Sequence, residues 1–180
     1  MAALRVYICG MRSALSLLAV VGLLACAGTS HTMLGPGAPA PDVVGVGANG
    51  TAVRLSERRG HPAVVYFYPK DQTPGCTREA CAFRDAFDRY VAARITVFGV
   101  SRDDLASHAA FQKEYQLPFP LVADVDGRVQ AAYGVPGRMG MAARVTFLID
   151  PTGKIAHVWS DVDPGVHADQ VLAQIERLGY

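Results

Sequence analysis

The most informative segment of the chain is an apolar run followed by a loop that ends at a cysteine, Ala63-Val64-Val65-Tyr66-Phe67-Tyr68-Pro69-Lys70-Asp71-Gln72-Thr73-Pro74-Gly75-Cys76. Six consecutive apolar residues are typical of a strand that is covered on both faces of a sheet. Helical spacing follows from Thr77 to Ala93. The loop therefore lies between the carboxyl end of a buried strand and a helix, the edge at which open α/β sheets bind ligands.

The helix expected over residues 77–93 has an apolar face and a charged face. Its apolar face contains Ala80, Phe83, Phe87, Tyr90 and Val91. Its opposite face carries two pairs of opposite charge at i,i+4 spacing, Arg84 with Asp88 and Asp85 with Arg89. Such pairs are typical of an exposed helix surface, so we expect this helix to pack on one face of a sheet.

The rest of the chain alternates between strand and helix periods. We expect strands at 95–100 and 121–123, helices at 105–116, 128–133 and 166–178, and a hairpin of 145–149 and 155–159 around the turn Asp150-Pro151-Thr152-Gly153. A weaker pair of strands precedes them at 43–46 and 52–54. The strands at 63–68 and 95–100 with the helix between them form a βαβ unit with a right-handed crossover. This order predicts an α/β fold, a thioredoxin-like three-layer sandwich around a central mixed β-sheet.

Composition excludes several classes of protein. The chain has 180 residues, 51% of them hydrophobic, and 17 Lys and Arg against 16 Asp and Glu. A net charge of +1 provides no electrostatic basis for binding nucleic acid, and the apolar content is too high for a disordered chain. Four cysteines are too few for a fold built on disulfides.

The N-terminus has the pattern of an export signal. Arg5 and Arg12 precede an apolar run over residues 14–25, which is shorter than a bilayer span of about 20 residues. The run ends Leu23-Leu24-Ala25-Cys26, which resembles the lipobox of bacterial lipoproteins, in which the cysteine is lipidated. We expect a lipoprotein-type signal peptide at 1–25, a lipidated Cys26, a flexible tether at 26–41 and the folded domain at 42–180.

This interpretation places the domain in the bacterial cell envelope, lipid-anchored or periplasmic. An ordinary secretory signal or an uncleaved anchor would have a similar pattern. If translation starts at Met33 instead, the protein is cytoplasmic.

Cys76 is expected in the first turn of the helix that follows the loop. Unpaired N–H groups and the positive end of the helix dipole favour an anion there, so the residue is a candidate thiolate. Cys81 follows five residues later, and in an unbroken helix the two Cα atoms are about 8.6 Å apart. A disulfide rarely spans more than about 7 Å, so the pair can bond only after local unwinding, as suits a redox cycle.

No metal or cofactor site is expected from the sequence. No histidine follows the two cysteines at ligand spacing. The five histidines are scattered along the chain, and we expect each to have a surface or packing role: His31, His61, His108, His157 and His167.

The loop also carries a family resemblance. Pro69-x-x-x-Thr73-x-x-Cys76 resembles the active-site pattern of the peroxiredoxins, and the longer Tyr66-Phe67-Tyr68-Pro69-Lys70-Asp71 with Thr73-Pro74-Gly75-Cys76-Thr77 and Cys81 resembles their Q-type branch, the bacterioferritin comigratory proteins. Similarity extends from about residue 37 to residue 179 and includes the segments 97–101 and 144–150. It implies a thioredoxin-dependent peroxidase that reduces hydrogen peroxide or alkyl hydroperoxides and is reduced by thioredoxin or an exported thioredoxin-like protein. We expect this enzyme to be a monomer.

The resemblance assigns roles to individual residues. Cys76 is the peroxidatic cysteine, which becomes a sulfenic acid, and Cys81 is the resolving cysteine, which forms the Cys76–Cys81 disulfide. Pro69 shields the thiolate, and Thr73 donates a hydrogen bond to the sulfur and the peroxide. Arg144 stabilises the thiolate, with Arg138 as the next candidate cation.

Two further points concern residues near Arg144. Glu79 either orients Arg144 or is a solvated carboxylate on the helix surface. The segment 136–143 differs from many members of the family, which leaves the size of the substrate open.

Two other classes remain to be distinguished from a peroxidase. An exported thioredoxin-fold protein for thiol–disulfide exchange or copper handling would also have a leader and paired thiols, although copper-delivery relatives use a closer cysteine pair and a distant histidine. A binding module on an inactive scaffold is the other, but every residue of the active-site pattern is present. Loss of two thiols in the presence of peroxide and without added metal distinguishes the peroxidase.

Overall fold

The computed structural model describes residues 32–180. The signal peptide predicted at 1–25 and the lipidation predicted at Cys26 lie outside the described residues. Among residues 32–180, no helix is long and apolar enough to cross a membrane.

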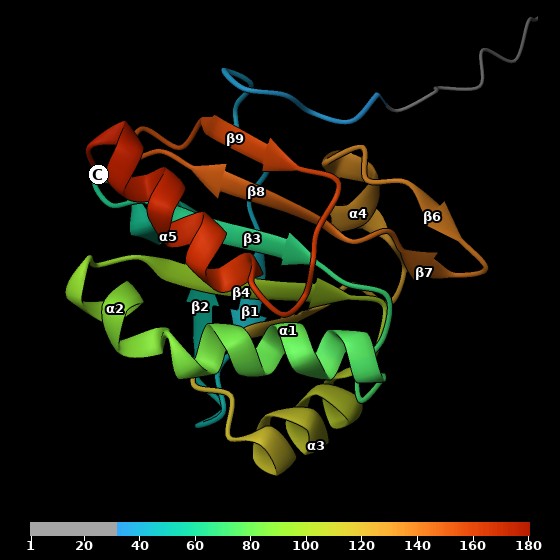
Figure 1. Ribbon diagram of the computed structural model, residues 1–180. Helices are drawn as coiled ribbons and strands as arrows, with labels where there is room; N and C mark the ends of the chain where they lie inside the picture. The colour runs from blue at the N-terminus through green and yellow to red at the C-terminus, as the bar shows by residue number, and fades with distance from the viewer. Residues whose placement is uncertain (1–31) are drawn as a thin grey trace, which may run out of the picture.

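A seven-stranded mixed sheet forms the centre of the molecule, in the order β2-β1-β5-β4-β3-β8-β9 (Figure 1). The strands are β1 Val44–Val46, β2 Ala52–Arg54, β3 Ala63–Phe67, β4 Thr96–Ser101, β5 Leu121–Ala123, β8 Val145–Ile149 and β9 Ile155–Trp159. β3, β4 and β5 run parallel to one another, whereas β8 is antiparallel to β3 and pairs with β9 as a hairpin. The parallel strands and the hairpin confirm the expected mixed sheet.

Helices cover both faces of this sheet. They are α1 Pro74–Asp85, α2 Phe87–Ala92, α3 Leu105–Tyr115, α4 Arg128–Ala132 and α5 His167–Leu178, with a 3-10 helix at Leu55–Arg58. Apolar side chains of α1, α2, α3 and α5 share one core with one face of β3. The other face of β3 packs with residues of α4, the 3-10 helix and the N-terminal segment. The result is the predicted three-layer sandwich, with most of the helical mass on the side of α1 (Figure 1).

Strand β3 is the centre of both cores because all five of its residues are buried. Val64 and Tyr66 point into the core under α1, and Val65 and Phe67 point into the other one. Successive side chains of a strand face opposite sides, so a strand covered twice needs an unbroken apolar run. This is the reason that the sequence of the segment predicted its position.

The single helix predicted over 77–93 is wrong in its extent. The helix begins earlier, at Pro74, and is broken at Ala86 into α1 and α2. The break redirects the chain so that the fully buried Tyr90 donates a hydrogen bond to the carbonyl oxygen of Ala168, at 2.7 Å. Val91, predicted on the apolar stripe, is 56% exposed because the helix changes direction.

The two i,i+4 ion pairs predicted for this helix are also wrong. Arg84 pairs with its neighbour Asp85 and donates to the carbonyl oxygen of Tyr115 at 2.8 Å. Arg89 pairs with Asp169 on α5. Both arginines therefore fasten the helix to other elements of the fold.

The segment predicted to be the end of a flexible tether packs against the domain. The N–H of Leu34 donates to Tyr133 O at 3.0 Å, and those of Gly37 and Ala40 donate to Ile155 O and Gly153 O at 2.8 and 3.0 Å. These bonds attach residues 34–40 to the end of α4 and to the start of β9. The ordered domain therefore begins before residue 42.

The segment 136–143 forms a second, two-stranded sheet, β6 Gly137–Arg138 with β7 Met141–Ala142. Its tip projects from the body of the molecule (Figure 1), and Met139 there is 85% exposed. The hairpin leads directly into Arg144 and β8.

Candidate active site

Cys76 is the third residue of α1 and is almost completely buried. Thr73 precedes the helix in an extended conformation, and Pro74 occupies the first helical turn, where its missing N–H costs nothing. The first N–H groups of a helix have no partner within it, and the dipole is positive there. The sulfur therefore lies where a negative charge is stabilised.

Arg144 supplies a fixed cation to the same sulfur. It lies just before β8, and its Nη2 donates to Cys76 Sγ at 3.4 Å. Gly75 permits this approach, because a Cβ at that position would come within 3.3 Å of Arg144 Nη2. A guanidinium that donates to sulfur favours the thiolate over the thiol.

Glu79 lies on the other side of the guanidinium. Its carboxylate is fully buried and accepts a hydrogen bond from Arg144 Nη1. Burial raises the pKa of Glu79 to about 7, although the charge and hydrogen bond of Arg144 act in the opposite direction. For Arg144, burial opposes the charged form, but Glu79 and Cys76 outweigh it and raise its pKa. The geometry places Glu79 in contact with the arginine and away from solvent.

Cys81 lies on the same helix, about two turns after its start, and both thiols are free. It is half-buried and lines a surface groove with Arg78 and Asp85 of α1 and Val166, which precedes α5. Because α1 is wound throughout residues 74–85, the Cα separation of about 8.6 Å for this spacing applies, and the thiols are too far apart to bond.

Of the other predicted site residues, Thr73 makes a different contact from the one expected. Thr73 lies at the helix start, but its hydroxyl donates to Lys70 O at 2.9 Å and not to the sulfur. Pro69 is half-buried in the same loop. Arg138 is exposed on β6, so Arg144 is the cation at the thiol. Within residues 32–180, no group of three or more His, Cys, Asp or Glu side chains could hold a metal ion.

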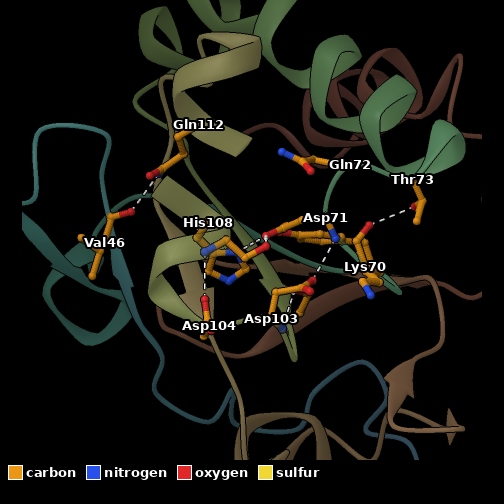
Figure 2. A network of polar contacts seen from close by, with 12 residues as sticks. Val46, Lys70, Asp71, Gln72, Thr73, Asp103, Asp104, His108 and Gln112 are labelled. Carbon is orange, nitrogen blue, oxygen red and sulfur yellow. Dashed lines mark hydrogen bonds and ion pairs between the residues drawn. The ribbon is translucent and has the colours of Figure 1, made fainter. Parts of the chain in front are cut away.

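A buried polar network behind the loop was not anticipated from the sequence. Asp71, between Pro69 and Thr73, is 5% exposed and contacts His108 of α3 (Figure 2). His108 is also buried, at 2% exposure, although the sequence suggested only a packing or surface role. The available signal was a charged residue inside the loop that carries the cysteine. A carboxylate immediately after a buried strand needs a partner, but the sequence does not say which one.

The family model described as the AhpC/TSA family matches residues 36–158. Over 145 residues, the chain is 39% identical to the putative peroxiredoxin Q, chloroplastic, of Oryza sativa subsp. indica, covering 79% of this chain and 67% of that protein. It is 41% identical over 133 residues to the peroxiredoxin Q, chloroplastic, of Triticum aestivum, covering 72% of this chain and 61% of that one.

Solved structures agree with these matches. Peroxidoxin BcpB from Mycobacterium tuberculosis superposes with a TM-score of 0.73 at 35% identity, over 82% of this chain and 99% of that one. Peroxiredoxin Q from Xanthomonas campestris superposes with a TM-score of 0.72 at 33% identity, over 84% of this chain and 100% of that one. The chain therefore belongs to the AhpC/TSA family and is a peroxiredoxin of the Q type.

Proposed function

We propose that this peroxiredoxin is a thiol peroxidase that reduces hydrogen peroxide and organic hydroperoxides through Cys76. The observation that carries the proposal is the contact of Arg144 Nη2 with Cys76 Sγ, at 3.4 Å, in the first turn of α1. A structural study of the Xanthomonas campestris bacterioferritin comigratory protein, 33% identical to this chain, concerns its alkyl peroxide reduction activity.

The first step is attack of the Cys76 thiolate on one oxygen of the peroxide. The S–O bond forms as the O–O bond breaks, which oxidises the sulfur to a sulfenic acid and releases the other oxygen, after protonation, as water or an alcohol. Arg144 stabilises the thiolate before the attack and the negative charge that develops on the leaving oxygen. Helix dipole and guanidinium act on the same atom from different directions.

The second step is resolution by Cys81. Its thiolate attacks the sulfenic sulfur, a disulfide forms and water leaves. Because both cysteines lie on the wound part of α1, this step requires the start of the helix to unwind. A thioredoxin-type dithiol then reduces the disulfide and returns both thiols to the reduced state.

The N-terminal pattern supports a location for this cycle. Leu23-Leu24-Ala25-Cys26 after an apolar run is the basis for proposing a lipid-anchored protein of the cell envelope, with an exported thioredoxin-like reductant. We also propose that the domain is a monomer. Labelling of cells with a lipid precursor, followed by fractionation, tests the anchor, and a Cys26→Ser variant that keeps the label would contradict it.

The test of function is peroxide turnover by the reduced full-length protein without added metal. We expect hydrogen peroxide to oxidise Cys76 and Cys81, identified by mass spectrometry as a linked peptide pair, and thioredoxin with its reductase to sustain turnover. A protein that exchanges disulfides with a thiol substrate but consumes no peroxide would instead support the thiol-exchange alternative. Addition of a copper chelator is the control for metal-dependent oxidation.

A further inference from the structure

The loop that carries Pro69 and Thr73 is attached to a helix that contributes no residue to the thiol site. The carboxylate of Asp71 accepts hydrogen bonds from Ser107 Oγ at 2.7 Å and from His108 Nδ1 at 2.8 Å, both on α3. It accepts a third, also at 2.7 Å, from the hydroxyl of Tyr68, which ends the apolar run before the loop. Figure 2 shows Asp71 reaching from the loop to His108.

The main chain of the loop is held by a second carboxylate, Asp103, which lies between β4 and α3. The N–H of Asp71 donates to Asp103 Oδ2 at 2.8 Å, and the same carboxylate oxygen accepts from Ser101 Oγ at 2.7 Å. Burial alone would raise the pKa of Asp71, but the hydrogen bonds and charge of His108 and the bonds from Tyr68 and Ser107 outweigh it and lower the pKa. A buried carboxylate with this many donors is held in place, because displacement of any one donor would lose a hydrogen bond that no water replaces.

The start of α1 has no side-chain hydrogen bond that caps it. Thr73 precedes the helix but makes no side-chain hydrogen bond to the first turn, because its hydroxyl donates to Lys70 O. Nevertheless, Cys76 in that turn must keep its contact with Arg144, which comes from a different element. The position of the turn must therefore be fixed from outside the helix.

We propose that Asp71 and His108 form a positioning pair that holds the loop 69–73 on α3 and so keeps Cys76 in register with Arg144. This inference rests on the proposed function and adds two positioning residues to it. Neither residue contacts the sulfur; they act through the loop between Pro69 and Thr73. None of their bonds involves residues 76–82, so the pair stays intact while the first turn of α1 unwinds and gives that turn a fixed point from which to wind again.

Positioning and simple charge have opposite effects on the thiol, which makes the proposal testable. If Asp71 acted only as a nearby negative charge, its removal would stabilise the Cys76 thiolate and lower the thiol pKa. If it positions the helix start, its removal separates the sulfur from Arg144, raises the thiol pKa and slows the reaction with peroxide. Displacement by about 1 Å can cost a reaction up to about 10²-fold.

The experiment compares Asp71→Asn, His108→Leu and His108→Asn in a full-length Cys81→Ser background. The pH dependence of iodoacetamide alkylation, followed on the Cys76 peptide, gives the thiol pKa, and single-turnover kinetics give the rate constant with hydrogen peroxide. Glu114→Ala is the matched control, because it removes the exposed bond from Gln72 Nε2 to Glu114 Oε2, at 3.0 Å, between the same loop and the same helix.

We expect Asp71→Asn and His108→Leu to raise the Cys76 pKa and to slow the reaction by about tenfold to a hundredfold. Because the two residues act together, the double variant that combines Asp71→Asn with His108→Leu should react with peroxide only slightly more slowly than either single variant. His108→Asn, which keeps a donor near the position of Nδ1, should recover part of the rate, and Glu114→Ala should match the parent.

A folded Asp71→Asn protein with an unchanged or lowered Cys76 pKa would overturn the proposal, as would additive effects of Asp71→Asn and His108→Leu. If Asp71→Asn does not fold, Ser107→Ala removes one of the donors to the same carboxylate and is tested by the same two measurements. The alkylation profile does not depend on peroxide reduction. If the parent protein consumes no peroxide, the proposed function is wrong. If the parent is active and the variants have the same Cys76 pKa and the same rate constant as the parent, the proposed positioning pair is wrong.

Discussion

Glu79 and Arg144 are paired at the thiol, 65 positions apart in the chain and in direct contact in the fold. The carboxylate of Glu79 has no exposed surface, while the guanidinium of Arg144 donates through Nη1 to this carboxylate and through Nη2 to Cys76 Sγ. One cation thus serves two acidic groups. Orientation of the fork by Glu79 fixes the direction in which the second amino group points.

Replacement of Arg144 by alanine should weaken the thiolate. We expect Arg144→Ala to raise the pKa of the Cys76 thiol and to slow the peroxide reaction by at least about 10²-fold, the usual cost of removing one such donor. Arg144→Lys cannot contact both Cys76 and Glu79, so its rate should lie between those of the wild type and Arg144→Ala. Arg138→Ala, at an exposed position on β6, is the control. An alkylation profile identical to that of the wild type would show that another cation stabilises the sulfur.

Removal of the Glu79 charge should change how stability depends on pH. The pKa of Glu79 is raised by burial to about 7, from an ordinary value of 4.5, so the folded state binds a proton that the unfolded state releases. The wild-type protein should therefore lose stability, by at most about 3 kcal/mol, as the pH rises from 4.5 to 7. Glu79→Gln should lack this loss. Urea unfolding of both proteins at pH 4.5, 6 and 8 measures the difference. If the free energy of unfolding depends on pH in the same way for both proteins, Glu79 does not have a raised pKa.

His167 should make the protein sensitive to acid. It is fully buried, its Nε2 contacts Thr146 Oγ1 at 2.8 Å, and burial lowers its pKa to about 4. The neutral ring stabilises the fold above pH 6.5, and this contribution, on the order of 3 kcal/mol, is lost as the pH falls from 6.5 to 4. His167→Gln should unfold with a flatter pH dependence over that range. A variant as acid-sensitive as the wild type would assign the effect to other groups.

Replacement of each cysteine should stop the peroxidase reaction at a different step. Cys76→Ser should abolish turnover, because it removes the nucleophile at the helix start. Cys81→Ser should consume one equivalent of peroxide and then stop as a sulfenic acid, unless an external thiol reduces it. Quenched-flow measurement of peroxide consumed per protein distinguishes the two. If Cys76→Ser consumed the first equivalent and Cys81→Ser did not, the roles would be reversed.

Oxidation should unwind the first part of α1. We expect amide exchange over residues 76–83 to become faster in the disulfide form, while the amides of β4 stay protected, because a disulfide between Cys76 and Cys81 is incompatible with the wound turn. The disulfide closes so short a loop that strain in the native state should outweigh its effect on the unfolded chain, and the oxidised protein should melt earlier. Equal exchange in both forms would contradict this.

The elements nearest the cysteine could be predicted from the sequence because their patterns are local. The apolar run of β3 predicts a doubly covered strand, and the motif from Pro69 to Cys76 places the thiol at a helix start. The break at Ala86 could not be predicted, because the helical spacing of the apolar residues and of the charged residues continues through it. It depends on the contact of Tyr90 with Ala168, 78 positions away in sequence.

The partners of individual side chains could not be predicted either, because they too are distant in the sequence. Spacing cannot show that Glu79 faces Arg144 and not solvent, nor that Asp71 meets His108, because each pair joins elements separated by dozens of residues. Thr73 illustrates the opposite case: the loop provides a nearer acceptor, Lys70 O, and its hydroxyl uses that one.

The break at Ala86 has a consequence for the catalytic cycle. Helix formation is cooperative within a continuous segment, so loss of the first turn tends to spread to the end of that segment and no further. Because α1 ends at Asp85, we expect the unwinding on oxidation to extend no further than that residue, so that α2 keeps the hydrogen bond from Tyr90 to Ala168 of α5. In the proposed cycle, the part of α1 that unwinds at each turnover is therefore confined to one cooperative unit, and Tyr90 stays in the core beside it.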